Sequence, residues 1–368
     1  MKIIRVLKWS LGALLLVLFG WLFVAYWMST NDCGRNAATP NNPMKAIVNC
    51  EYGVGNLELR ELEKPAPNDN EVLVHVRAAS INPADGHLIR GAWPMRPMTG
   101  LRKPKNTRFG TDFAGVVETV GKNITEFKPG DEVFGAKNGA AAEYVCVRVD
   151  KAVVPKPANI TFEQAGSVAI AGITALQGLR DKGHIQAGQK VLINGASGGV
   201  GTFAVQIAKA FGAEVTAVCS MRNVHLVKSI GADHVIDYSK EDFTKTDQRY
   251  DMIYDLVGNH SFSERRKVLT PNGICVLGGI GGAGIHPGSW GRILGNFWAM
   301  FLSSFTSQKF PTYIARLTKD DLTVMRDLMQ AGKVTPVIDR TYKMSDTQAA
   351  VRYMEEGHAR GKVVVVVE

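Results

Sequence analysis

Apolar and polar residues follow two different periods on either side of a glycine-rich turn at residues 195–201. Before the turn, Lys190–Asn194 is an apolar run of strand length, and after it apolar residues recur at helical spacing as far as Phe211. Gly212 is suited to end that helix as a C-cap. The pattern predicts a strand, a tight turn and a helix in direct succession.

The rest of the chain shows two kinds of pattern. After the turn, apolar runs of strand length alternate with helical segments, at 214–220, 234–238, 250–258 and 273–279. This alternation is typical of a doubly wound parallel sheet. Before the turn, from Met44 onward, short strands with alternating polar residues follow one another, as at 71–78. The expected fold class is therefore α/β, with a β-rich domain ahead of the parallel sheet.

The glycine-rich turn matches a dinucleotide-binding fingerprint. Small residues of the A-x-G-x-x-G pattern let the backbone approach a pyrophosphate at the positive amino-terminal end of the helix. A turn with a purely structural role is the alternative, but the flanking strand and helix supply the context that binding requires. The predicted cofactor-binding residues of the loop are Ala196, Ser197, Gly198, Gly199, Val200 and Gly201.

The second strand of this unit indicates which dinucleotide binds. An NAD site carries an Asp or Glu about 20 residues beyond the glycines. No acid lies between Glu214 and Asp233, and Ser220 and Arg222 stand there instead. A hydroxyl and a guanidinium suit a 2′-phosphate, so NADPH is the predicted cofactor. The alternative is that Arg222 merely begins a solvated helix.

Residues 9–28 contain no charged side chain and follow Lys2, Arg5 and Lys8. A helix of this length, at about 1.5 Å per residue, spans a hydrocarbon core of roughly 30 Å. We therefore expect a basic stub and a transmembrane anchor in 1–30, a linker in 31–43 and a single-pass membrane protein. A cleaved signal peptide is the alternative, although no small-residue cleavage site follows. The sequence does not decide which side of the membrane carries the folded region. The positive-inside rule places this region outside the cytoplasm, whereas NADPH is found mainly in the cytoplasm.

Charge and cysteine content narrow the classes of partner. The net charge is +9, but part of it lies in the amino-terminal segment and no dense Lys/Arg block is interleaved with aromatic residues. Binding to nucleic acid is therefore not expected. The five cysteines are scattered, with no pair at the spacing of a metal knuckle. They predict neither a disulfide framework nor a zinc lobe.

Further motifs occur in a fixed order along the chain, at 81–91, 110–121, 127–133, 269–273, 332–340 and 357–365. Together with the glycine loop they resemble the medium-chain dehydrogenase/reductase superfamily, in its zinc-free quinone oxidoreductase-like branch. The resemblance covers about residues 44–368. It implies a GroES-like catalytic domain over 44–156, a Rossmann NADP-binding domain over 157–310 and a carboxy-terminal segment, 311–368, that returns to the first domain.

The resemblance also implies site residues. Asn82 lies in a block that faces the nicotinamide in the family and is the preferred neutral donor to a developing oxyanion or enolate. His87 stands near the place of a Tyr in many relatives and could deliver a proton, but a surface histidine beside Arg90 is an equal alternative. The family's other cofactor contacts fall on Thr174, Tyr238, Val257, Gly258, Leu277, Gly278, Gly279 and Lys362. Burial in a strand explains the residues from 257 to 279 equally well.

A catalytic zinc ion does not fit this resemblance. Zinc alcohol dehydrogenases of the superfamily carry a His ligand in a Gly-His-Glu block, where this chain has Thr111, and the Cys expected before the first helix is missing from 80–83. No metal site is predicted, and polarisation of an alcohol by a Lewis acid is not the expected mechanism.

The predicted function is that of a membrane-anchored, zinc-independent oxidoreductase. It would transfer hydride from NADPH to a small, apolar, electrophilic substrate, a quinone or an enone. A tethered NADPH-binding protein with little turnover and an alcohol dehydrogenase are the alternatives. Apolar residues at helical spacing over 288–310 predict one more helix. This helix could belong to the core or to a homodimer interface, cover an apolar substrate, or lie in the plane of a membrane.

Overall fold

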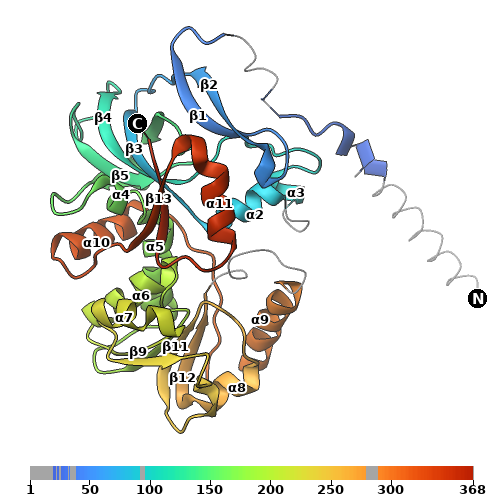
Figure 1. The fold of residues 1–368 in the computed structure, drawn as a ribbon, viewed down its shortest axis with the longest axis vertical. Coiled ribbons are helices and arrows are strands. Elements are labelled where there is room, and N and C mark those ends of the chain that lie inside the picture. The colour runs from blue at the N-terminus through green and yellow to red at the C-terminus, as the bar shows by residue number, and fades with distance from the viewer. Residues whose placement is uncertain are drawn as a thin grey trace, which may run out of the picture.

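A computed structural model gives the structure of the chain and describes residues 39–91, 96–278 and 289–367, together with 20, 21, 23, 24, 26–31 and 33. These residues form two domains stacked along the long axis of the molecule (Figure 1). One contains the parallel sheet, and the other contains the antiparallel strands and the end of the chain.

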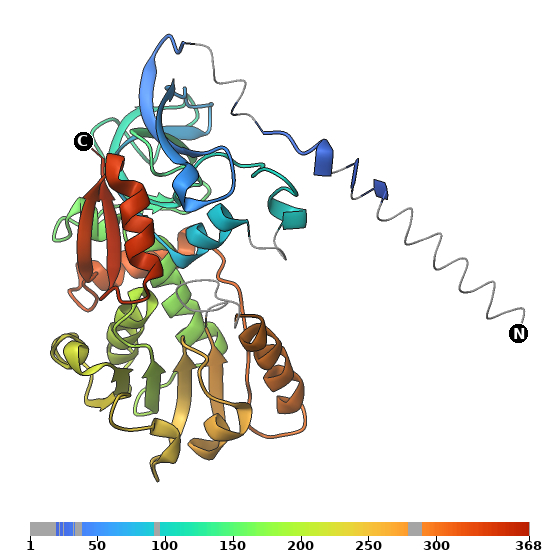
Figure 2. The ribbon, with the colours of Figure 1, turned by 45° about the vertical axis from the view of Figure 1, so that its right-hand side comes forward.

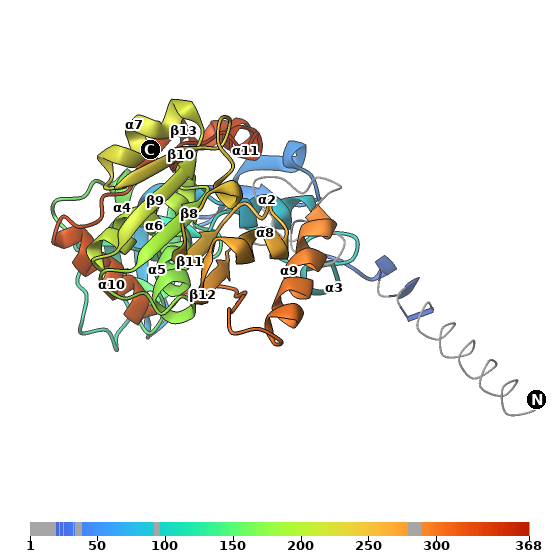
Figure 3. The ribbon, with the colours of Figure 1, turned by 90° about the horizontal axis from the view of Figure 1, so that it is seen from below.

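The parallel sheet has the strand order β10-β9-β8-β11-β12, visible from below in Figure 3. Its strands are β8 (Lys190–Asn194), β9 (Glu214–Cys219), β10 (His234–Asp237), β11 (Tyr250–Asp255) and β12 (Leu269–Leu277). Alternate residues of one strand pack on opposite faces: Val191 and Ile193 belong to one core cluster and Leu192 to another. Because side chains alternate across a strand, this pattern shows that both faces are covered. The predicted doubly wound sheet is confirmed.

The helices of this domain lie on both faces of the sheet. They are α5 (Ala169–Gln177), α6 (Gly199–Ala210), α7 (Val224–Ser229), α8 (Phe262–Lys267), α9 (Ser289–Ser303) and α10 (Lys319–Gln330). The predicted strand–turn–helix unit appears as β8, the glycine loop and α6. The preceding helix α4 (Phe162–Ala165) is capped by Thr161, whose hydroxyl accepts a hydrogen bond from Gln164 N.

The other domain is built on a larger, mainly antiparallel sheet with the order β13-β14-β3-β4-β5-β7, in which β6 also pairs with β3. Its strands are β3 (Glu71–Ile81), β4 (Asp112–Val120), β5 (Glu132–Ala136), β6 (Tyr144–Arg148), β7 (Val153–Pro155), β13 (Ile338–Lys343) and β14 (Lys362–Val366). The hairpin of β1 (Pro43–Asn49) and β2 (Leu57–Glu63) and the helices α2 (Pro83–Arg90), α3 (Arg96–Thr99) and α11 (Thr347–Glu355) complete the domain. Figure 2 shows the red carboxy-terminal elements lying with this domain.

The free edge of β12 is covered by a short segment of chain. Cys275 N donates to Lys309 O at 2.8 Å, and Leu277 N donates to Pro311 O at 2.9 Å. The preceding helix α9 buries Ala299 but exposes Phe297, Trp298 and Phe301, and Phe305 in the turn after the helix is exposed as well. These aromatic side chains therefore lie outside the core, whereas Ala299 of the same helix belongs to it. Residues 279–288, including the predicted cofactor contact Gly279, lie outside the described residues.

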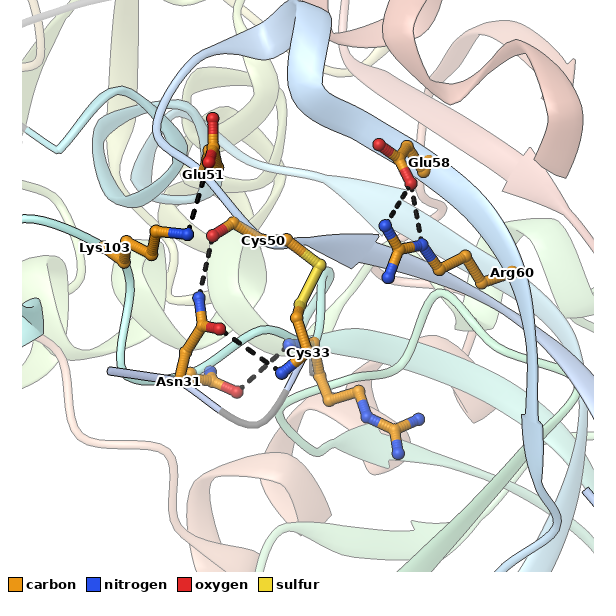
Figure 4. The surroundings of a disulfide bond; sticks show 9 residues. Asn31, Cys33, Cys50, Glu51, Glu58, Arg60 and Lys103 are labelled. Atoms are coloured by element: carbon orange, nitrogen blue, oxygen red, sulfur yellow. Dashed lines mark hydrogen bonds and ion pairs between the residues drawn. A yellow bond between two sulfur atoms is a disulfide. The ribbon is translucent and has the colours of Figure 1, made fainter. Parts of the chain in front are cut away.

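The structure contains one cysteine pair that the sequence spacing does not indicate. Cys33 and Cys50 form a disulfide with a Cα–Cα distance of 5.8 Å, which fixes the chain before β1 to the end of that strand (Figure 4). Asn31 Nδ2 donates to Cys50 O at 2.7 Å beside the same bond. The expectation that these two cysteines are unpaired is corrected by this disulfide.

The predicted membrane localisation also needs correction. Among the residues that the structure describes, we find no helix with both the length and the apolar character needed to cross a bilayer. Of the predicted span 9–28, residues 9–19, 22 and 25 lie outside the described residues. The prediction of a single-pass membrane protein is contradicted by this finding, and the transmembrane helix is not confirmed.

Candidate active site

The predicted cofactor loop lies between β8 and α6, at the carboxyl edge of the parallel sheet, where ligands bind in doubly wound folds. Two of its glycines, Gly201 and Gly198, serve different purposes. A Cβ at Gly201 would lie 2.1 Å from Gly195 O, so only glycine lets the helix pack on the loop. A Cβ at Gly198 would have Gly195 O, at 3.5 Å, as its nearest atom among the described residues. The space in front of Gly198 is therefore open to a ligand.

Asn223 joins this loop to the end of β9. Its Nδ2 lies 2.9 Å from Ser197 Oγ and 3.2 Å from Ser220 Oγ, and donates to both. Its Oδ1 is buried and has no hydrogen-bond partner among the described residues. A ribose hydroxyl would satisfy that acceptor. The open space in front of Gly198 and the unpaired Oδ1 of Asn223 fit the adenosine half of a dinucleotide. The sequence pattern did not identify Asn223 as a site residue.

The predicted 2′-phosphate residues gather around the same edge. Cys219 and Asp237 are register partners in β9 and β10, so Ser220 and Tyr238 follow neighbouring strand ends. Arg222 is exposed, and its Nη2 donates to His358 O at 3.1 Å. The guanidinium is thus held by the loop that leads into β14, with other N–H groups left for a phosphate.

The predicted cofactor contacts Val257, Gly258 and Gly278 follow the ends of β11 and β12, and Leu277 is the last residue of β12. Asp255 Oδ1 accepts hydrogen bonds from the backbone N–H groups of Val257 at 3.1 Å and Gly258 at 2.9 Å. Gly278 follows Leu277, the last residue of β12, and a Cβ at Gly278 would lie 2.5 Å from Tyr254. These contacts give Asp255 and Gly278 roles in shaping the loops. The sequence alone did not indicate this structural role for either residue.

Thr174 lies on α5, which crosses between the two domains in Figure 1. Its carbonyl oxygen accepts hydrogen bonds from the hydroxyl groups of Tyr254 at 3.1 Å and Tyr313 at 2.6 Å. Burial raises the pKa of both phenols above the ordinary value. The two tyrosines therefore remain neutral donors that fix this turn of α5.

A polar cluster lies where the two domains meet; we call it the junction cluster, and it consists of Ser80, Asn82, Asp85, Thr111, Asp112 and Lys362. Strand register brings its members together. Val363 is paired with Ile81, so the preceding Lys362 stands opposite Asn82, and Ser80 is paired directly with Asp112. Residues far apart in sequence thus meet at the ends of the adjacent strands β14, β3 and β4.

Hydrogen bonds connect most of the junction cluster. Lys362 Nζ donates to Asn82 Oδ1 at 2.5 Å and lies 3.7 Å from Asp112 Oδ2. Asp112 Oδ2 also accepts from Ser80 Oγ at 2.8 Å and Asn82 Nδ2 at 3.0 Å. The other oxygen of Asp112 accepts from Ile170 N, in the first turn of α5, at 2.9 Å. One buried carboxylate therefore joins both domains.

Lys362 also lies against the cofactor loop. A Cβ at Gly199 would lie 3.2 Å from Lys362 Cδ, and Gly361 N donates to Ser197 O at 3.0 Å. Lys362 is fully buried, and this burial lowers the pKa of its ammonium group against the opposing effect of Asp112. The side chain thus links the predicted cofactor loop to Asn82.

The structure places the two predicted catalytic residues differently. Asn82 is 2% exposed, and its amide is engaged by Lys362 and Asp112. One amide N–H remains for the predicted donor role. His87 is partly exposed on α2, two positions after the buried Asp85. Residues two apart on a helix do not share a face, so His87 and Asp85 lie on different faces of α2. Both catalytic roles stay predictions.

Comparisons with known proteins agree with this architecture. A family model described as "Alcohol dehydrogenase GroES-like domain" matches residues 68–158, and one described as "Zinc-binding dehydrogenase" matches 230–365. The "NAD(P)H oxidoreductase RTN4IP1, mitochondrial" of Bos taurus is 35% identical over 335 residues, which cover 80% of this chain and 81% of that protein. The chain belongs to the medium-chain dehydrogenase/reductase superfamily.

Two further relatives place this superfamily member in the quinone oxidoreductase-like branch. The "2-methylene-furan-3-one reductase" of Solanum lycopersicum is 32% identical over 88% of this chain and 79% of that protein. The solved quinone oxidoreductase from Coxiella burnetii has a TM-score of 0.76 and 28% identity, over 89% of this chain and all of that chain. The predicted GroES-like and Rossmann folds are confirmed. So are the enzyme class and cofactor: the chain is an NADP-dependent oxidoreductase of the quinone/enone reductase-like type, and it uses NADPH.

The superfamily includes zinc enzymes, so the donor atoms at the corresponding positions decide whether zinc fits. Asn82 and Thr111 offer an amide and a hydroxyl, and the amide oxygen is already bound by the Lys362 ammonium. Within the described part of the chain, no group of three or more His, Cys, Asp or Glu side chains is placed to hold a metal ion. These residues do not fit a catalytic zinc ion.

Proposed function

We propose that this enzyme transfers hydride from NADPH to a carbon–carbon double bond conjugated to a carbonyl group, or to a quinone. Bound NADPH would supply the hydride, while the chain supplies binding, orientation and protons. Such substrates are small, apolar and electrophilic. They accept hydride because the resulting negative charge spreads onto an oxygen, which neutral hydrogen-bond donors can stabilise.

The junction cluster is the observation that carries the proposal. It holds an amide, a hydroxyl and a buried ammonium group where a zinc alcohol dehydrogenase holds its metal. A substrate that already carries an electron-poor double bond needs less polarisation than a saturated carbonyl or an alcohol. The names of the relatives, which include a furanone reductase and a quinone oxidoreductase, support the same class of reaction.

The test is a comparison of substrate panels with the purified chain. Loss of the reduced-nicotinamide absorbance is measured with NADPH and enones, alkenals or quinones, and separately with saturated ketones and alcohols. We expect consumption with the first group and little with the second. Silence of every panel, with NADPH binding still visible by fluorescence, would favour a binding protein with little turnover. The predicted homodimer, and the expected lack of nucleic-acid partners, remain proposals.

A further inference from the structure

Thr111 differs from the other members of the junction cluster in its exposure. Ser80, Asn82, Asp85, Asp112 and Lys362 are each at most 4% exposed, whereas Thr111 is only partly buried. Of these six side chains, Thr111 therefore offers the one outlet from the buried cluster. It directly precedes Asp112, whose carboxylate binds α5 one turn before Thr174. The outlet thus lies beside α5, which carries the predicted cofactor contact Thr174.

The buried carboxyl group of Asp85 lies next to the Thr111 hydroxyl group. Thr111 Oγ1 and Asp85 Oδ1 are 3.5 Å apart, and Asp85 Oδ2 accepts a hydrogen bond from Asn82 N at 2.8 Å. The carboxyl group has no access of its own, since Asp85 is 4% exposed. A proton leaving or entering Asp85 on this side therefore passes through the Thr111 hydroxyl, which can accept one proton while it donates another.

The charges of the cluster favour a protonated Asp85. Asp112 and Lys362 form one buried pair of opposite sign, so an ionised Asp85 would leave an unbalanced negative charge. Burial, together with repulsion from Asp112, raises the pKa of Asp85 to about 7, against the opposing effects of Asn82 and Lys362. The other charged groups near α2 are its own Arg90, paired with Glu355 of α11, and the partly exposed His87.

We propose that Thr111 donates the proton that completes the reduction and that Asp85 supplies it. This inference rests on the proposed function. Bound NADPH would supply the hydride that forms the new C–H bond at the β-carbon of an enone, and an enolate and NADP⁺ would remain. The Thr111 hydroxyl passes its proton to the enolate, takes the proton of Asp85 in the same step, and leaves an Asp85 carboxylate. Solvent then reprotonates Asp85 through Thr111.

The kinetic test compares two substitutions of one residue. Thr111→Val removes the hydroxyl at nearly constant volume, and we expect turnover of an enone to fall about 100-fold, the usual scale of general-acid catalysis. Thr111→Ser keeps the hydroxyl and should keep most of the turnover. NADPH binding, followed by fluorescence, should be unchanged in both variants. Turnover of Thr111→Val equal to that of the wild type would overturn the proposal.

The second test follows the proton itself in the cofactor-free protein. Infrared difference spectra recorded across pH should show a protonated-carboxyl band that disappears as the pH rises through about 7. Asp85→Asn should remove this band. Because Asp85 supplies the proton, wild-type turnover should fall as the pH rises through about 7, and Asp85→Asn should abolish this fall. A band that persists in Asp85→Asn would contradict the proposal. A wild-type chain that reduces no substrate would instead overturn the proposed function, and the infrared titration would still decide whether Asp85 stores the proton.

Discussion

The cofactor loop and the junction cluster lie side by side, but the first is formed by backbone atoms and the second by side chains. The loop consists of backbone from one continuous stretch, 195–201, whose glycines provide close packing and open space. The junction cluster consists of buried side chains from strands up to 280 positions apart. Backbone built from one stretch can be recognised from a local pattern, whereas a side-chain cluster depends on strand register. The two regions should therefore respond differently to substitution.

The largest effect is expected for Lys362→Met. The substitution keeps the aliphatic stem but leaves the fully buried Asp112 carboxylate without its cation, so we expect a loss of about 4 kcal/mol in the free energy of unfolding. Denaturant unfolding measures it. Adding Asp112→Asn to the variant should restore much of the loss, and the exposed Lys333→Met should change stability little. A loss in Lys333→Met as large as in Lys362→Met would contradict the assignment.

Asp85 predicts a pH dependence of stability. Its pKa rises from 3.8 to about 7 on folding, so between these values the folded chain holds a proton that the unfolded chain has released. The free energy of unfolding therefore falls as the pH rises through this window. Asp85→Asn lacks this term, so its stability relative to the wild type should rise by roughly 4 kcal/mol from about pH 4 to above pH 7. Parallel stability curves for the two proteins would refute the burial of a neutral Asp85.

Substitutions at Gly201 and Gly198 should separate an effect on folding stability from an effect on cofactor binding. Gly201→Ala places a Cβ 2.1 Å from Gly195 O, and we expect a loss of about 3 kcal/mol in thermal or denaturant unfolding. Gly198→Ala meets no such contact and should fold normally, yet it should weaken NADPH binding by filling the cradle. Gly55→Ala, where a Cβ meets nothing within 4 Å, is the matched control. Equal stability of the Gly201 and Gly198 variants would contradict this division.

Arg222→Ala is expected to have the smallest effect and the most specific one. Loss of a single exposed guanidinium should weaken NADPH binding about tenfold, or about 1.4 kcal/mol, and leave NADH binding unchanged. Calorimetric titration with both nucleotides measures this difference. Arg249→Ala is a suitable control, because this exposed arginine precedes β11 at the opposite edge of the sheet. An equal loss of NADH affinity would show that Arg222 does not contact the 2′-phosphate.

The sequence alone predicts the parallel-sheet domain well because its signals are local. The apolar run of β8, the glycine turn and the helical spacing of α6 lie within about two dozen residues, and strand ends place Ser220 and Tyr238 together. Arg222 can be recognised from the missing acid. Asn223, by contrast, is identified only by the hydroxyl groups of Ser197 and Ser220 that it bridges.

The junction cluster could be predicted only in part. Asn82, Thr111 and Lys362 stand out through family motifs, but the register that sets Lys362 opposite Asn82 and Ser80 opposite Asp112 has no local signal. Asp85 and Asp112 look like ordinary surface acids until their burial is known. The Cys33–Cys50 disulfide escapes prediction for the same reason, since a separation of 17 residues has no characteristic pattern. The exposed aromatic face of α9 likewise depends on tertiary contacts.

The central claim is that the junction cluster works in place of a metal, and metal removal tests it most directly. The purified chain is treated exhaustively with chelator, its zinc content is measured, and its NADPH-dependent reduction of an enone is compared with that of untreated protein. We predict an unchanged rate and one saturated ketone formed per NADPH consumed. A rate that falls on chelation and returns on addition of zinc would contradict the account.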